Sequence, residues 1–176
     1  MRLVVTSDTH GQHWLIDGYY KNQFPFGNIF IHVGDMTKRG NWQDMANFRM
    51  WCSNLPYKYK ICIAGNHDRC LESRKNAKRF FSEMGIIYLD EEEIIIDCVK
   101  FYGTPWSLPF NDWAFNRKEE ELRYRFSKIP KDTDVLISHC PPKYILDLAP
   151  PLPHLGRYEP ENAGSVSLRE RVEIIK

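Results

Sequence analysis

The sequence predicts an α/β fold built around a largely parallel β-sheet. Short apolar runs rich in Val and Ile alternate along the chain with longer segments of helical character. Strands that are covered by helices on both faces have this unbroken apolar character. Alternation of such strands with helices is typical of an α/β domain with a parallel sheet at its centre.

The element boundaries follow from apolar runs and capping residues. We predict core strands at residues 2–6, 28–33, 59–64 and 134–138, and a short antiparallel set at 86–89, 93–97 and 100–102. Helices are expected at 41–55, 71–84, 113–126 and 167–176, and the Pro-rich segment 141–160 is expected to be a loop. The expected helix caps are Asn41, Asp112 and Ser165 or Ser167, and Gly85 is the expected stop after the second helix.

Length and composition favour one folded domain over residues 1–176. The chain is 43% hydrophobic and 27% charged, as in a globular protein. Its 24 Lys and Arg residues nearly balance 23 Asp and Glu residues, so the net charge of +1 makes nucleic acid an unexpected partner. No apolar stretch approaches the roughly 20 residues that span a bilayer, no secretory leader begins the chain, and the five cysteines form no CxxC pair. We therefore expect a cytoplasmic protein with reduced thiols and no membrane partner.

Polar side chains follow each of the four core strands. The first strand leads into Ser7-Asp8-Thr9-His10-Gly11, the second into Gly34-Asp35, the third into Gly65-Asn66-His67-Asp68, and the fourth into Ser138-His139-Cys140. Open α/β sheets bind their ligands at the carboxyl ends of the strands, where the loops are held by rigid elements. We therefore expect these side chains to converge on one site.

The residue types indicate a metal site. The candidate ligands offer carboxylate, imidazole and amide oxygen, which suit divalent ions such as Mn²⁺, Fe or Zn²⁺; they are Asp8, His10, Asp35, Asn66 and His139. Asp8 and His10 are two residues apart and share a face of an extended chain. Asp35, alone on its loop, is the natural bridge between two ions. Two ions roughly 3.5–4 Å apart activate water and hold both oxygens of an in-line phosphoryl displacement.

These motifs together resemble the calcineurin-like metallophosphoesterase superfamily. The motifs are DxH at Asp8 and His10, GD at residues 34–35, GNHD at 65–68 and the later Ser138-His139, in the order the family has them. The segments FYGTPW at 101–106 and DWAFN at 112–116, followed by 130–142, are similar to the small metallophosphoesterase-domain-containing proteins. The resemblance covers nearly the whole chain.

The resemblance implies a role for each residue. Asp8 and His10 would hold the first metal, Asp35 would bridge, and Asn66 and His139 would hold the second metal. His67 would face the substrate phosphate together with Asn66 and would protonate the leaving oxygen. Asp68 would orient either the loop or the imidazole. The implied cofactor is a pair of divalent ions, with Mn²⁺ expected and Fe or Zn²⁺ as alternatives.

The implied fold is a four-layer α/β/β/α sandwich. One motif of the family is absent from this sequence. The superfamily pattern has a GHxH motif after a further strand, but this sequence stops at the helix that normally precedes that strand. His154 is the only histidine after His139, and it lies in the Pro-rich segment. We therefore expect a fold that lacks its last core strand, as if C-terminally truncated, and a homodimer or partner that covers the exposed strand.

The sequence favours hydrolysis of a small phosphodiester, such as a cyclic nucleotide, by a metal-bridging hydroxide. Two alternatives stay open: a weakened phosphoesterase fold used as a binding module, and a nuclease of the same fold.

Simpler interpretations also exist for single residues. Asp8 and Asp35 would serve as helix caps if they stood alone, and His13 and His32 are expected to be structural. Core packing is the favoured role of four aromatic residues, which are Tyr102, Trp106, Trp113 and Phe115. A solvent-exposed helix face is the favoured interpretation of five basic residues, which are Arg69, Arg74, Lys75, Lys78 and Arg79.

Overall fold

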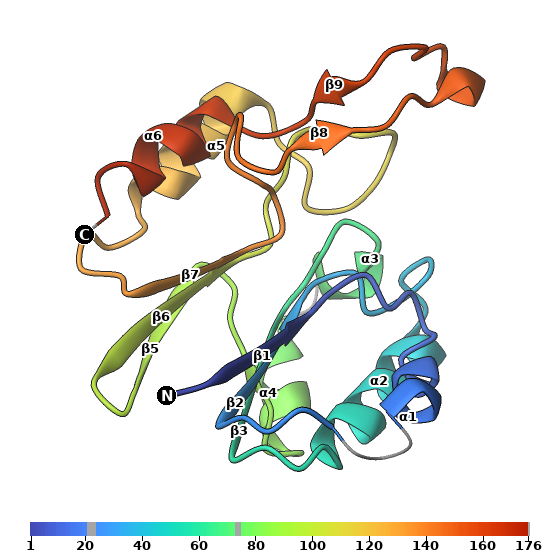
Figure 1. The fold of residues 1–176 in the computed structure, drawn as a ribbon, viewed down its shortest axis with the longest axis vertical. Helices are drawn as coiled ribbons and strands as arrows, with labels where there is room; N and C mark the ends of the chain where they lie inside the picture. Colours follow the sequence, from blue (N-terminus) through green and yellow to red (C-terminus); the bar gives the residue numbers. More distant parts are fainter. Residues whose placement is uncertain (21–23, 73–74, 176) are drawn as a thin grey trace.

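The strands that end in polar loops form one parallel sheet. The computed structural model describes residues 1–20, 24–72 and 75–175. The first sheet contains β1 (Leu3–Thr6), β2 (Ile29–Val33), β3 (Tyr59–Ile63) and β4 (Ile87–Tyr88), in the order β1-β2-β3-β4 and all parallel (Figure 1). The register aligns Thr6 with His32 and His32 with Cys62. The carboxyl ends of the first three strands therefore open at the same edge.

The prediction that residues 86–89 belong to an antiparallel set is wrong. Ile87 pairs with Ile61 in parallel, so β4 extends the first sheet beside β3. Two short helices, α3 (Arg69–Glu72) and α4 (Ala77–Ser82), connect β3 to β4. A helical crossover of this kind is what a parallel connection requires.

The second sheet has three strands. The strands β5 (Glu92–Ile96) and β6 (Val99–Thr104) form the predicted antiparallel hairpin, and β7 (Val135–Ser138) lies parallel to β6. The helix α5 (Glu119–Ser127) crosses between β6 and β7. In the second sheet, His139 directly follows the carboxyl end of β7.

The two sheets pack against each other through one apolar layer. Alternate residues of β2 and β3 are fully buried against Phe101 and Ile137 of the second sheet, and this layer includes Ile29, Ile31, Ile61 and Ile63. A Cβ atom on Gly103 of β6 would lie 2.4 Å from the Cβ of Leu89. The sheets therefore approach closely where β6 passes over the first sheet.

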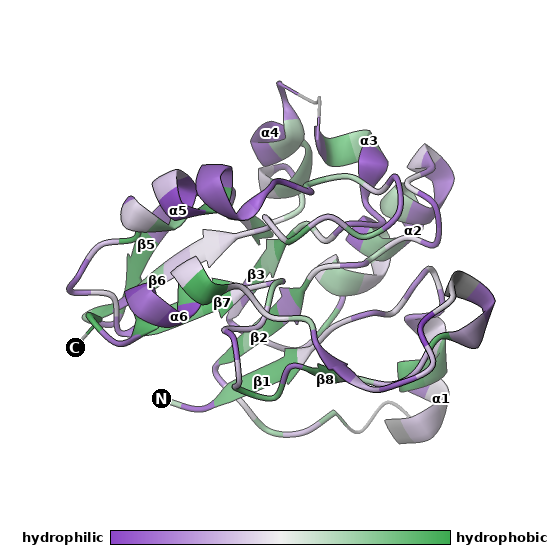
Figure 2. Ribbon diagram, turned by 90° about the horizontal axis from the view of Figure 1, so that it is seen from above, coloured by the Kyte–Doolittle hydropathy of each residue, from purple (hydrophilic) through white to green (hydrophobic). Residues whose placement is uncertain are grey.

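Helices cover the outer face of each sheet. The helices α1 (Trp14–Tyr20), α2 (Trp42–Ser53) and α4 lie beside the first sheet, and α5 and α6 (Val166–Val172) lie over the second (Figure 1). Figure 2 shows β1, β2 and β3 largely in the green of hydrophobic residues and α5 largely in the purple of hydrophilic ones. The predicted sandwich of two sheets between helices is confirmed.

The capping signals are partly confirmed. The Asn41 side chain accepts a hydrogen bond from the Asp44 backbone N–H at 2.8 Å, and the Ser165 hydroxyl accepts one from Leu168 N–H at 3.2 Å. Gly85 has φ of +69°, as a residue after a helix end requires. Asp112 caps no helix, because α5 begins only at Glu119, where three glutamates favour a helix N-terminus.

The other differences concern helices and a small hairpin. The helix predicted at 71–84 is divided into α3 and α4, and residues 73 and 74 of that range lie outside the described residues. The helix α1 was not predicted. The Pro-rich segment holds β8 (Leu148–Ala149), the 3₁₀ turn η1 (Pro153–Leu155) and β9 (Glu161–Asn162), and the hairpin lies toward the carboxyl ends of the strands (Figure 1).

Candidate metal centre

The loops after β1 and β2 are bonded to each other by their backbones. Asp8 N–H donates to Gly34 C=O at 3.0 Å, and His10 N–H donates to Asp35 C=O at 2.9 Å. These bonds continue the pairing of β1 with β2 past the end of the sheet. The two candidate-bearing loops are therefore held side by side.

Three of the candidate ligands have left-handed backbone conformations. The φ angles are 55° for Asp8, 46° for His10 and 57° for Asp35. A residue with a Cβ atom adopts this region only when the surroundings impose it, at a cost of about 1–2 kcal/mol. Strained residues often gather at functional sites, and these three share one cluster of loops.

The side chains converge on the buried carboxylate of Asp35. Its Oδ2 atom lies 3.8 Å from His10 Nε2 and 3.9 Å from His67 Nε2, and its Oδ1 atom lies 3.5 Å from His139 Nε2. Asp8 Oδ1 lies 3.8 Å from His10 Nε2. Asp35 thus lies between two groups of candidate metal ligands, as a bridging ligand must.

Backbone carbonyls set the orientation of all three histidines. The Nδ1 atoms of His10, His67 and His139 lie 3.3 Å from Thr37 C=O, 2.7 Å from Lys38 C=O and 2.9 Å from Val33 C=O, respectively. A carbonyl oxygen only accepts, so each Nδ1 atom carries the proton. In the neutral ring the Nε2 lone pair is then free and faces Asp35. This arrangement is typical of metal-binding histidines.

A second observation concerns His139 and Asn66. His139 Nε2 lies 2.9 Å from Asn66 Oδ1 and 3.5 Å from Asp35 Oδ1. Because Nδ1 holds the proton of the neutral ring, all three facing atoms are acceptors. A cation at this place, either a proton on Nε2 or a metal ion, makes the arrangement favourable, and so does an Asn66 amide turned so that its NH2 group donates to Nε2.

Two glycines allow the ligands to approach one another. A Cβ atom on Gly65 would lie 2.2 Å from Asp35 Oδ1 and 2.6 Å from His139 Cε1. A Cβ atom on Gly34 would lie 2.7 Å from His139 Nδ1. The glycines of the GD and GNHD motifs therefore make room for the side chains of the site.

Asp68 joins the loops after β2 and β3. Its carboxylate is fully buried and accepts hydrogen bonds from the N–H groups of Met36, Thr37 and Gly65, at 2.9–3.2 Å, and from the Thr37 hydroxyl at 3.0 Å. Burial raises the pKa of Asp68 to about 6, and the hydrogen bond from Gly65 opposes that rise. Of the two roles expected for Asp68, these contacts are those of a residue that orients the loop.

The structure brings all seven candidate residues together. The ring nitrogens of His10 and His67 and the Asp35 carboxylate lie within 4.8 Å of one another. His67, predicted to face substrate, therefore lies in the same cluster as two predicted ligands. Its assignment as a catalytic residue and the assignments of the five ligands stay predictions.

The remaining candidates are distributed between core and surface. Buried His13 and His32 pack against Phe48, and Tyr102, Trp106 and Phe115 are buried. Trp113 is different, because it is half-buried and its ring stacks on His67 with centroids 3.9 Å apart. In the basic segment, Lys78 forms an ion pair with Glu92, and Arg79 forms one with Glu83. Arg69 lines a cavity. Arg74 lies outside the described residues.

Sequence reasoning missed three residues around His67. Thr37 donates its hydroxyl to His67 C=O at 3.1 Å, and Lys38 supplies the carbonyl that fixes His67 Nδ1. Arg39 follows and lines the cavity beside His67. All three residues follow the Gly34-Asp35 motif at a strand end. That position in the sequence was the signal that could have identified them as site residues.

Comparison with known proteins agrees with this geometry. The family model described as calcineurin-like phosphoesterase matches residues 1–170. The chain belongs to the calcineurin-like phosphoesterase family. This family consists of metal-dependent phosphoesterases, and the converging histidines and carboxylates described above fit that chemistry.

Similar proteins occur in animals and fungi. The chain is 32% identical over 172 residues to metallophosphoesterase domain-containing protein 1 of Homo sapiens, covering 85% of this chain and 51% of that protein. It is 31% identical over 161 residues to a UPF0046 protein of Caenorhabditis elegans, covering 84% and 53%. It is 34% identical over 166 residues to probable rhamnogalacturonate lyase C of Emericella nidulans, covering 89% of this chain but 15% of that protein. The chain spans about half the length of the animal relatives.

The donor set also fits the metal ions that the family implies. Imidazole, carboxylate and amide ligands bind first-row divalent ions. The acceptor atoms of His139, Asn66 and Asp35 face one another, as they would around a cation. In the described part of the chain, all helices are too short or too polar to cross a membrane.

Proposed function

We propose that this protein hydrolyses a small phosphodiester at the site around Asp35. The observation that carries the proposal is that three Nε2 atoms, each fixed by a backbone carbonyl on its Nδ1 side, face one buried carboxylate. Two divalent ions, when bound, would supply an activated water and neutralise the charge that develops on the phosphate. Mn²⁺ is the proposed ion, with Fe and Zn²⁺ as alternatives.

Each residue has a role in this proposal. Asp8 and His10 would hold one ion, Asn66 and His139 would hold the other, and Asp35 would be the ligand that they share. Asp35 is suited to this role because its two oxygens face different histidines and its side chain is only 5% exposed. Asp68 and Thr37 keep the Asp35 loop and the Asn66 loop in register.

His67 acts on the leaving group. Its Nδ1–H donates to Lys38 C=O, so its Nε2 atom is the one directed into the site. In the imidazolium form Nε2–H donates to the leaving oxygen as water attacks phosphorus and the P–O bond breaks. The imidazolium proton passes to the alcohol product and the ring becomes neutral, while the attacking water leaves its OH on the phosphate monoester and releases its other proton to solvent.

The proposed substrate class is the small phosphodiesters, with cyclic nucleotides as the starting candidate. This choice follows the resemblance to the small metallophosphoesterase-domain-containing proteins. A nuclease of the same fold remains an alternative, and Mn²⁺-dependent nicking of a plasmid that Asp35→Asn abolishes would favour it.

The test is hydrolysis of bis-p-nitrophenyl phosphate with Mn²⁺ and with a chelator. Asp35→Asn should abolish turnover and metal binding together, because it removes the bridging charge. The matched control is Asp132→Asn, since Asp132 is an exposed carboxylate outside the site. Turnover by folded Asp35→Asn protein, or turnover that a chelator leaves unchanged, would contradict the proposal.

A partner at the edge of the second sheet is a further proposal. Within the described residues β7 is an outer strand of its sheet, and an outer strand presents unpaired backbone groups. We expect a homodimer or a partner that pairs with β7. Sedimentation equilibrium of the purified chain would show the dimer, and a monomer at all concentrations would exclude self-association.

A further inference from the structure

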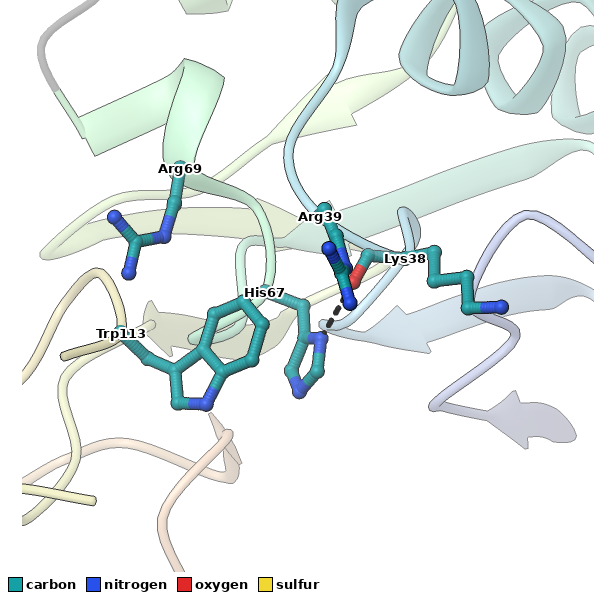
Figure 3. A pocket seen from close by; sticks show the side chains of 5 residues that line it. All are labelled: Lys38, Arg39, His67, Arg69 and Trp113. Atoms are coloured by element: carbon teal, nitrogen blue, oxygen red, sulfur yellow. Dashed lines mark hydrogen bonds between the residues drawn. The ribbon is translucent and has the colours of Figure 1, made fainter. Parts of the chain in front are cut away.

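A cavity of about 540 Å³ lies beside His67 and is lined mainly by cations. The lining residues are Lys38, Arg39, His67, Arg69 and Trp113 (Figure 3). They come from the loop after β2, from the GNHD loop and α3, and from the segment that precedes α5. The cavity therefore adjoins the site through the same histidine that faces the scissile phosphate in the proposed function.

The wall of this cavity is fixed by backbone contacts. Gly40 has φ of +73°, and a Cβ atom on it would lie 2.6 Å from Arg69 Cβ and Arg69 N. Gly40 N–H also donates to the Thr37 hydroxyl at 2.8 Å, and Thr37 is bonded to His67 and Asp68. Because the turn at 37–40 packs directly on the start of α3, Arg39 and Arg69 are held beside one space, and the Lys38 side chain extends away from Trp113 at its edge (Figure 3).

The cavity carries excess positive charge. Among the described residues, the side chains of Lys38 and Arg39 form no ion pair. Arg69 Nη2 lies 3.5 Å from Asp112 Oδ2, a fully exposed carboxylate, so that pair is weak. Three cationic residues thus line the cavity, and Asp112, which pairs with Arg69, is the carboxylate recorded beside them.

Trp113 gives the cavity its floor and limits what binds there. One contact of its ring is the stack on His67, and Arg69 Cζ lies 5.2 Å from its centroid (Figure 3). Because His67 and Arg69 both lie against the indole, it offers little free surface to a nucleobase. The cations are therefore the groups available to recognise a ligand.

We infer that this cavity binds a second phosphate of the substrate. This phosphate is carried by one of the groups that the scissile phosphodiester joins. This inference rests on the proposed function, because it assigns the scissile phosphate to the centre around Asp35. Guanidinium and ammonium groups are the usual protein ligands of phosphate. A simple cyclic nucleotide has one phosphate and would leave the cavity empty, so phosphodiesters that carry an additional phosphate are the preferred class.

The test compares two substrates that differ by one phosphate. These are the p-nitrophenyl ester of thymidine 5′-phosphate and the same ester with a phosphate on the 3′ oxygen. We expect kcat/KM with Mn²⁺ to be about fivefold higher for the substrate with the extra phosphate, which is the upper end of the attraction expected from a solvent-exposed charge pair. The preference should disappear in Lys38→Ala/Arg39→Ala and decline with added salt.

The matched control is Lys58→Ala. Lys58 is an exposed lysine that precedes β3, at the opposite end of that strand from Asn66, so the variant should keep the preference. Equal kcat/KM for the two substrates in the wild-type protein would overturn the inference and leave the proposed function standing. A preference that survives in Lys38→Ala/Arg39→Ala would also overturn it.

A binding measurement separates this inference from the proposed function. Calorimetric titration should show that thymidine 3′,5′-bisphosphate binds about fivefold more tightly than thymidine 5′-phosphate, and that the double variant removes the difference. Absence of turnover with this binding pattern would refute the proposed function alone. Equal affinities for the two nucleotides would refute the second-phosphate site, whatever the turnover.

Discussion

At the scale of single residues, His67 is positioned from three sides. Lys38 C=O fixes its Nδ1 atom, Trp113 stacks on its ring, and the His10 ring meets it edge-on with centroids 4.6 Å apart. The Nε2 atom is left to face Asp35 at 3.9 Å. A ring held this firmly can act as a proton donor without reorganising, which is what general acid catalysis requires.

We expect His67→Ala to lower turnover of a phosphodiester with an alcohol leaving group, such as a cyclic nucleotide, by about 10²–10⁴ while it leaves the metal content unchanged. The reason is that the variant removes the proton donor but keeps Asp8, His10, Asp35, Asn66 and His139. Metal content is measured by atomic emission on the protein after removal of free ions. The control is His154→Ala, at an exposed position. Loss of bound metal from His67→Ala would show that His67 is itself a ligand.

At the scale of elements, the site depends on loops that continue the pairing of the strands. β1, β2 and β3 end at one edge, and hydrogen bonds between their loops extend that alignment to Asp8, His10 and Asp35. Asp68 extends it further by binding N–H groups of both the β2 and β3 loops. The position of the ligands is therefore a property of the sheet and not of any single loop.

We expect Asp68→Asn to lower the free energy of unfolding by about 2–3 kcal/mol. The amide has one acceptor oxygen in place of two, so at least one buried N–H group loses its partner. Urea denaturation measures the change, with Asp132→Asn as the exposed control. An Asp68→Asn variant of full stability but reduced turnover would contradict the loop role and indicate that Asp68 acts through the imidazole.

At the scale of the whole molecule, the layers between helices and sheets bury ionisable groups. His32 lies in β2 between the sheet and α2, is fully buried, and has Thr9 Oγ1 3.0 Å from its Nε2 atom. Burial is the main cause that lowers the pKa of His32 to about 3, and the nearby His13, His139 and His10 contribute to the same shift. The folded protein therefore keeps this ring neutral over the range in which the unfolded chain protonates it.

This difference predicts an acid-sensitive fold. The unfolded chain binds one more proton than the folded protein between about pH 6.5 and pH 3, so the stability present above pH 6.5 declines on acidification by up to about 1.4 kcal/mol per pH unit. His32→Gln should flatten this slope in urea denaturation with a chelator present. His154→Gln, at an exposed site, should keep it. A variant slope equal to that of the wild type would contradict the assignment.

Local patterns in the sequence determined the core strands and the composition of the site. The runs at 2–6, 28–33, 59–64 and 134–138 each contain an observed strand, and each leads into candidate ligands. Asn41 and Ser165 cap helices as expected, because a cap depends on residues only three positions apart. Parallel strands place their carboxyl ends together, so the clustering of these motifs also follows from the sequence.

Contacts between distant segments were decided only by the tertiary structure. The position of β4 beside β3 depends on how α3 and α4 cross the sheet, and periodicity does not encode that path. Trp113 stacks on His67 because the segment before α5 is loop where helical propensity predicted helix. Lys38, Arg39 and Arg69 surround one cavity because Gly40 packs on Arg69, a contact across 29 positions. The sequence thus determined which chemical groups reach the site, and long-range packing decided which cations and rings surround it.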